Sequence, residues 1–144
     1  MCAKPSKTVG FVTFGCKLNH AETQIMREAF EARGFVFGAA LAQKLGKGLI
    51  LIRKPGKLPG ETIGFDYGLE YGRDRLELHR HDLPAGAKVL LVDDVLATGG
   101  TAEAAVGLIE AAGASVTRAI FVIELEALGG GARLTVPWQS LVRY

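Results

Sequence analysis

The chain has 144 residues, of which 49% are hydrophobic and 22% charged, a composition typical of one globular domain with its own core. Its 17 basic and 15 acidic residues give a net charge of +2, which argues against a nucleic-acid-binding protein. No apolar run reaches the ~18 residues needed to span a bilayer, and the N-terminus lacks the pattern of a secretory signal. Two cysteines, Cys2 and Cys16, do not suggest a disulfide framework. We therefore expect a cytoplasmic protein with no membrane or nucleic-acid partner.

The first third of the chain predicts two helices flanked by strands. The β-branched and aromatic run from Thr8 to Phe14 predicts a buried strand. From His20 to Arg33 apolar residues recur at helical spacing, and Gly34 is a natural end for that helix. A second helix is predicted from Val36 to Leu45, and a short buried strand from Leu49 to Ile52.

The middle of the chain predicts an antiparallel excursion followed by a strand and a helix. The segments Ile63 to Tyr71 and Arg75 to His79 alternate polar and apolar residues, as a solvent-exposed flap would. The turn between them is expected near residues 72–74. A central strand is predicted from Lys88 to Val92, and a helix from Thr101 to Ala112.

The C-terminal third predicts a strand from Ser115 to Glu124, a flexible loop from Gly129 to Gly131 and an edge strand from Leu141 to Arg143. Strands alternate with helices along the chain. The fold class is therefore α/β: a Rossmann-like, mainly parallel sheet with helices on both faces, in a single domain over residues 1–144.

Polar residues follow several predicted strands. Arg53, Asp93 and Glu124 each lie at the carboxyl end of a strand. Because ligands bind at these ends in open parallel sheets, the three side chains are expected to face one crevice.

The stretch Leu90 to Ala102, with the sequence LLVDDVLATGGTA, carries the most specific pattern. An apolar run ends in Asp93 and Asp94, whose carboxylates can accept hydrogen bonds from ribose hydroxyls. A loop of small residues and hydroxyls then opens a helix, an arrangement that binds phosphate through backbone N–H groups. A buried strand, turn and helix without a ligand is the alternative. The residues expected to hold a sugar 5′-phosphate are Ala97, Thr98, Gly99, Gly100 and Thr101.

A cationic cluster of Arg53, Lys54 and Lys57 follows an earlier predicted strand. Its position at a strand end favours binding of a pyrophosphate group, whereas a solvated turn is the alternative. His79 and His81 flank Arg80 and are interpreted as surface residues, so no metal site is predicted.

These motifs together resemble a known family. VDDVLATGGT resembles the phosphoribosyl-pyrophosphate (PRPP) motif of the type I phosphoribosyltransferases, and RKPGKLP with the flap sequence LEYG is most similar to the adenine phosphoribosyltransferases. The resemblance runs from about Glu31 to Tyr144. It implies a phosphoribosyltransferase core with an antiparallel flap, and transfer of phosphoribose from PRPP to adenine, giving AMP and pyrophosphate. It also implies substrate-bound Mg²⁺ and a homodimer.

The resemblance assigns roles to further residues. Glu70 and Tyr71 belong to the loop that closes over PRPP, and Tyr71 helps to shield the reacting sugar from water. With Asp93 and Asp94 they form the catalytic set. In EARGF, Arg33 is the expected pyrophosphate contact, together with Arg53, Lys54 and Lys57.

The beginning of the chain resembles a different family. Thr8 to Phe35 is similar to the N-terminal domain of the radical-SAM methylthiotransferases, in which GCKLN supplies a cluster cysteine, here Cys16. The two resemblances overlap at EARGF, which suggests a chimera of a βα unit (residues 1–35) and a phosphoribosyltransferase core (residues 31–144). Two alternatives follow. One is a non-catalytic domain that keeps a ribose-5-phosphate or AMP pocket but has lost the adenine-contacting hood. The other is a folded chain without function or with an iron–sulfur cluster, although one cysteine is too few thiolates for a cluster.

Overall fold

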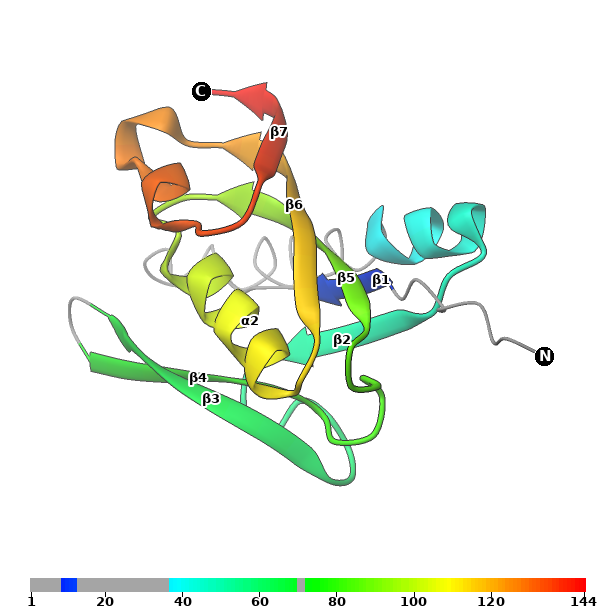
Figure 1. Cartoon of the computed structure of the whole chain (residues 1–144). Helices are drawn as coiled ribbons and strands as arrows, with labels where there is room; N and C mark the ends of the chain where they lie inside the picture. Colours follow the sequence, from blue (N-terminus) through cyan, green and yellow to red (C-terminus); the bar gives the residue numbers. More distant parts are fainter. Residues whose placement is uncertain (1–8, 13–36, 70–71) are drawn as a thin grey trace.

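The structure, a computed structural model, describes residues 9–12, 37–69 and 72–144. The elements are β1 (Val9–Val12), a helix over residues 37–45, β2 (Leu49–Arg53), β3 (Thr62–Leu69), β4 (Gly72–His79), β5 (Lys88–Leu96), α2 (Gly100–Ala111), β6 (Ser115–Glu124), the 3-10 turns η1 (Glu126–Leu128) and η2 (Gly130–Arg133), and β7 (Trp138–Arg143). Helices follow β1 and β5, whereas β2 to β5 follow one another without a helix between them (Figure 1).

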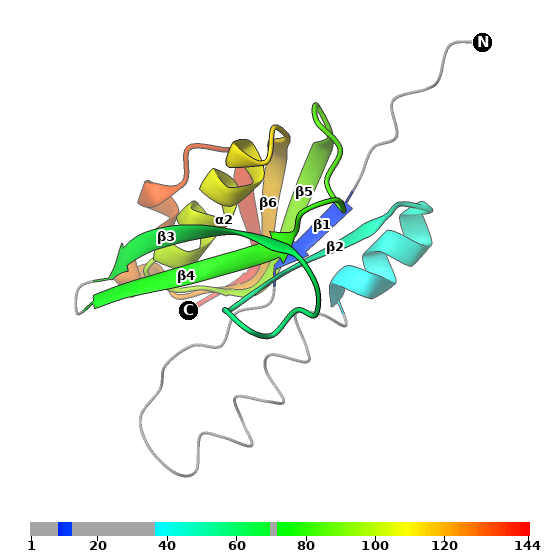
Figure 2. The same cartoon turned by 90° about the horizontal axis from the view of Figure 1, so that it is seen from below.

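The strands form two sheets. One has the order β1-β2-β4-β3, in which β1 and β2 are parallel and the β3–β4 hairpin is antiparallel. The other has the order β5-β6-β7, with every pair parallel. Strand β1 lies beside β5, so the parallel strands of both sheets follow one another across the molecule (Figures 1 and 2). The predicted α/β class with a mainly parallel sheet is confirmed.

Helices cover both faces of this arrangement, because successive apolar side chains of β5 point to opposite faces of the sheet. Val89 and Leu91 belong to the main core, into which α2 packs. The intervening Leu90 and Val92 contact a second cluster, which includes Ala42 of the helix over residues 37–45. A strand with apolar residues on both faces is what a buried parallel strand requires.

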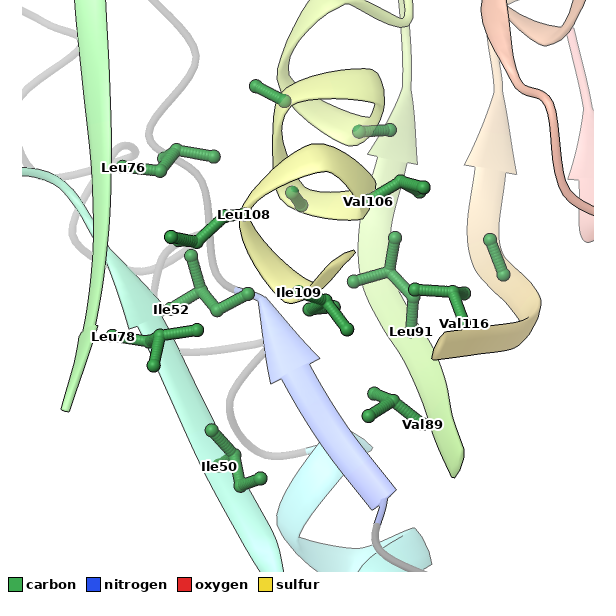
Figure 3. Close-up of a cluster of buried hydrophobic side chains, with 14 of the residues drawn as sticks. Ile50, Ile52, Leu76, Leu78, Val89, Leu91, Val106, Leu108, Ile109 and Val116 are labelled. Atoms are coloured by element: carbon green, nitrogen blue, oxygen red, sulfur yellow. The ribbon is translucent and has the colours of Figure 1, made fainter. Parts of the chain in front are cut away.

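The main core lies between α2 and the strands (Figure 3). Full burial of one such aliphatic side chain stabilises the fold by about 1.5–3 kcal/mol. The core draws on strands from both sheets, which ties them together through α2. Among its members in Figure 3 are Ile50, Ile52, Leu76, Leu78, Val89, Leu91, Val106, Leu108, Ile109 and Val116.

The hairpin turn differs from the sequence prediction. Residues 72–74 are not a turn but part of β4, where Gly72 pairs with Leu69 and Asp74 pairs with Tyr67. The predicted turn position is therefore wrong, since β3 ends at Leu69 and β4 begins at Gly72; residues 70–71 lie outside those that the structure describes. The glycine suggested a turn, but here it continues an extended strand.

The hairpin is also not a solvent-exposed flap along its whole length. Leu76 and Leu78 are fully buried, and Leu78 pairs with Ile52 of β2. On β3, Phe65 packs so closely on α2 that a Cβ at Gly107 would lie 2.8 Å from its ring. The apolar half of the alternating pattern therefore faces α2, and the base of the hairpin belongs to the core.

Other boundaries shift by a few residues. Strand β5 continues beyond Val92 to Leu96, and β7 begins at Trp138. The glycines at 129–131 belong largely to η2 rather than to an irregular loop. The predicted helix from His20 to Arg33 lies outside the described residues. Within the described part of the chain, no helix is long and apolar enough to cross a membrane.

Candidate functional site

The acid pair lies in the second half of β5. Asp93 is 2% exposed and Asp94 is 9% exposed, and the Asp94 backbone N–H donates a 2.9 Å hydrogen bond to Asp93 Oδ1. Burying carboxylates is costly unless partners satisfy them. Two such side chains at the carboxyl end of a core strand therefore indicate a ligand-binding role rather than a packing role.

Burial changes the protonation of one member of the pair. Loss of solvent raises the pKa of Asp94, and hydrogen bonds with Asp93 and with the backbone N–H of Val95 offset part of that rise. A ligand hydroxyl that donates to the Asp94 carboxylate would favour the charged form and pull this pKa back down. Hydroxyl donors from a ligand would therefore stabilise the charged form of Asp94.

The loop after β5 presents backbone donors. The chain leaves the strand at Ala97, turns through Gly99 at φ +78°, and enters α2 at Gly100. The Gly99 carbonyl accepts the first helical bond, from the Glu103 N–H at 2.9 Å. Because glycine has no side chain to cap the helix, the N–H groups of the first turn are left for an external acceptor. This geometry suits a phosphate.

The turn η2 packs against this loop and against the start of α2 (Figure 1). A Cβ at Gly130 would lie 2.1 Å from the Ala97 carbonyl oxygen and 2.7 Å from the Gly99 nitrogen. In return, a Cβ at Gly99 would lie 2.2 Å from the Gly130 carbonyl oxygen. Backbone packs directly on backbone here, which only glycine at both positions allows. The loop therefore has a fixed support.

The cationic cluster at the end of β2 is linked to the hairpin. Lys54 Nζ donates to Tyr67 Oη at 2.6 Å, forms an ion pair with Asp74, and lies 5.2 Å from the centre of the Tyr67 ring. Arg53 is half-buried as the last residue of β2, whereas Lys57 is exposed. Of the cluster, Lys54 is the residue that connects β2 to both strands of the hairpin.

This contact also affects Asp74. Burial raises the pKa of Asp74, but the hydrogen bonds from Lys54, the Arg75 backbone and Tyr67 outweigh it, so the pKa lies below its usual value. Asp74 is therefore held as a carboxylate over the range in which the protein would work.

The sequence from 29 to 134 matches the profile of a family described as the phosphoribosyl transferase domain. The chain belongs to this family. It is 60% identical over 104 residues to a curated adenine phosphoribosyltransferase of Novosphingobium aromaticivorans, a match that covers 72% of this chain and 58% of the relative. The chain thus spans less than two thirds of that relative's length.

Solved phosphoribosyltransferase structures share the fold. An adenine phosphoribosyltransferase of Rhodothermus marinus superposes with a TM-score of 0.79 at 38% identity, covering 96% of this chain and 70% of that one. A Saccharomyces cerevisiae enzyme, complexed with an imino-altritol bisphosphate and adenine, superposes with a TM-score of 0.75 at 38% identity, covering 94% and 68%.

One residue expected to face the crevice is bound by β7, and three predicted site residues are not described. Glu124, expected at the same crevice as Arg53 and Asp93, is buried against β7, where Ser140 Oγ donates to it at 2.9 Å and Arg143 Nε lies 3.4 Å away. Glu124 does lie at a strand end, as predicted, but its carboxylate binds a hydroxyl and a guanidinium of β7. The predicted site residues Arg33, Glu70 and Tyr71 lie outside the described residues, as does Cys16.

A separate shallow cavity of about 360 Å³ lies near the end of the hairpin. Most of its lining residues lie in the segment that leads into the amino end of β5, whereas the acid pair lies toward the carboxyl end of that strand. Among the residues that the structure describes, no group of three His, Cys, Asp or Glu side chains is arranged to hold a metal ion. The cavity is lined by Glu61, His79, Arg80, His81 and Asp82.

The structure adds residues that the motifs did not identify. Gly130 supports the phosphate loop, Arg133 lies beside its helix, and Asp74 with Tyr67 binds Lys54. Small residues at 129–131 were a usable signal, because a glycine can mark a close backbone approach as well as a flexible loop. The other three depend on strand register and on long-range packing.

Proposed function

We propose that this chain transfers phosphoribose from PRPP to adenine, giving AMP and pyrophosphate. A bond forms between an adenine nitrogen and the ribose anomeric carbon, and the bond from that carbon to pyrophosphate breaks. Pyrophosphate leaves with the electron pair, and the adenine nitrogen gives up its proton. The observation that carries the proposal is the buried pair Asp93–Asp94 followed directly by the phosphate loop, at 60% identity to an adenine phosphoribosyltransferase.

The acid pair has two roles in this proposal. The carboxylates accept hydrogen bonds from the ribose hydroxyls and so fix the sugar. They also lie in a water-poor environment, where their charge favours a sugar ring that becomes cationic as pyrophosphate departs. Because burial raises the pKa of Asp94, a hydroxyl donor would stabilise its charged form.

The two ends of PRPP are held differently. The 5′-phosphate binds the N–H groups and hydroxyls of residues 97–101, which one rigid turn supports. The pyrophosphate binds the cations Arg53, Lys54 and Lys57, with Arg33 as a further contact. Mg²⁺ arrives with the substrate and neutralises the pyrophosphate charge. Because it keeps several waters, it needs few protein ligands.

The tip of the hairpin supplies the cover. Glu70 and Tyr71 lie between β3 and β4, whose bases are part of the core. A tip carried on two anchored strands can exclude water from the reacting carbon, which would otherwise be hydrolysed. We propose Tyr71 as the shield and Glu70 as the acid nearest the reacting groups.

The test is an assay for AMP formation from adenine and PRPP with Mg²⁺. We expect turnover in the wild-type chain and its loss in the double variant Asp93→Asn, Asp94→Asn. This variant keeps side-chain size but removes both charges. A wild-type rate no higher than that of the double variant would reject the proposal.

A second candidate is binding without catalysis. It is suggested by the match to the Novosphingobium enzyme, which covers 58% of that enzyme's length. In this case the pocket keeps ribose 5-phosphate or AMP but lacks the residues that contact the base. Calorimetry separates the two: AMP binding without turnover supports this candidate, and the absence of binding rejects both.

Two further properties complete the proposal. A homodimer would cover apolar side chains at the edge strand, where Leu141 is 65% exposed, Val142 43% and Tyr144 75%. Sedimentation of the chain as a monomer at micromolar concentration would reject the homodimer.

We also propose that residues before about Glu31 descend from a methylthiotransferase-like segment, joined to the phosphoribosyltransferase core in a cytoplasmic protein.

A further inference from the structure

The side chain of Arg133 lies over the start of α2. This residue ends η2, the turn that supports the phosphate loop. Its Nη1 is 3.5 Å from the position that a Cβ would take on Gly100, the first residue of the helix. Its Nε and Nη2 contact Glu103 Oε2 at 2.9 Å and 2.6 Å. A guanidinium is thus held beside the backbone donors of the phosphate loop.

The Glu103 contact leaves this cation available. Both side chains of the pair are 49% exposed, and exposed ion pairs are weak. One carboxylate oxygen accepts both contacts, so the planar fork of the guanidinium is not fully matched. A phosphate dianion offers more charge and more acceptor oxygens than this carboxylate, and arginine binds it in a bidentate manner.

We propose that Arg133 is a further binding residue for the sugar 5′-phosphate, exchanging Glu103 for the ligand when the loop is filled. The inference rests on the proposed function, because it requires a phosphate in the loop formed by residues 97–101. Its physical basis is that Gly130 fixes η2 against that loop, so the backbone from which Arg133 extends is already in place. Arg133 would add charge to a site otherwise built from backbone N–H groups and threonine hydroxyls.

The experiment measures AMP and magnesium pyrophosphate binding by calorimetry in the wild type, Arg133→Gln and Arg133→Lys. We expect Arg133→Gln to weaken AMP binding by about tenfold, the usual effect of losing a charged hydrogen bond. Pyrophosphate binding should not change, because it uses the cations at the end of β2. Arg133→Lys should recover part of the loss, since charge remains but the fork does not.

Arg118→Gln is the matched control, because Arg118 is an exposed arginine bonded to Gln139 on the sheet rather than to the loop. It should bind both ligands as the wild type does. Equal AMP affinity in the wild type and Arg133→Gln would overturn the inference, as would an equal loss for AMP and pyrophosphate or the same AMP loss in Arg118→Gln. If the wild type itself binds no AMP, the proposed function fails and the inference fails with it.

Discussion

The contact between Gly130 and the phosphate loop allows one substitution to test the site directly. Gly130→Ala adds a single methyl group at a point where the Ala97 carbonyl oxygen is 2.1 Å away. Real Cβ atoms essentially never approach another heavy atom closer than 3.0 Å, so the two backbones must separate by about 0.9 Å. Neither neighbour is a flexible side chain, and the strain therefore falls on the loop itself.

Two magnitudes follow from this displacement. Over-packing of a close contact costs about 1–3 kcal/mol of stability. A backbone donor that moves by about 1 Å loses its hydrogen bond to the phosphate, and each such bond to a charged group contributes about 1.5–3 kcal/mol to binding. We expect Gly130→Ala to remain folded and to lose most of its affinity for the 5′-phosphate of AMP, because the loop donors no longer converge.

AMP calorimetry and urea unfolding measure the two effects separately. Gly129→Ala is the control: its φ of +62° is also strained for alanine, but no atom lies within 4 Å of the new Cβ. It should lose about 1 kcal/mol of stability and bind AMP normally. If Gly130→Ala binds AMP as tightly as Gly129→Ala does, the turn is not the support of the loop and the reasoning is wrong.

Three further predictions use unfolding measurements. Burial raises the pKa of Asp94, so its contribution to the free energy of unfolding is present below the ordinary aspartate pKa and is lost as pH rises through the raised pKa. Asp94→Asn should therefore have a higher melting temperature than the wild type at pH 7. An unchanged melting temperature would contradict this. The pKa of Asp74 is shifted in the opposite direction, so its contribution to stability is lost as pH falls through the lowered pKa. In urea titrations Asp74→Asn should reduce the free energy of unfolding by less than about 1 kcal/mol at pH 7, and by less still at pH 3. Leu78→Ala should cost about 2–5 kcal/mol, whereas Leu141→Ala on the exposed edge should cost less than about 0.5 kcal/mol; similar losses would mean that the hairpin base is not core.

The sequence predicted the order of elements around the site because apolar runs and turn residues are local signals. The strand from Ser115 to Glu124 was predicted with the bounds that the structure has. The end of β5 was placed too early, since two adjacent carboxylates normally indicate that a core strand has ended. In this fold the strand continues through Asp93 and Asp94, and their burial is a property of the site that hydrophobic patterning does not predict.

The errors in the hairpin have a different cause. Gly72 suggested a turn, and a turn placed two residues late would put Asp74 at the tip rather than opposite Tyr67. The Lys54 contact depends on that register, and no local pattern specifies it. The same applies to Gly130, whose partners are far away in the sequence, so its fixed packing could not be distinguished from flexibility before the loop was seen beside it.

The parts of the proposed 5′-phosphate site follow one another along the chain. Strand β5, the loop, α2 and the supporting turn η2 all fall within residues 88–133. Recombination that exchanges the sequence before Lys88 would therefore leave 5′-phosphate recognition whole. Evolution could then change which acceptor receives the sugar while inheriting the sugar-phosphate pocket as a single unit.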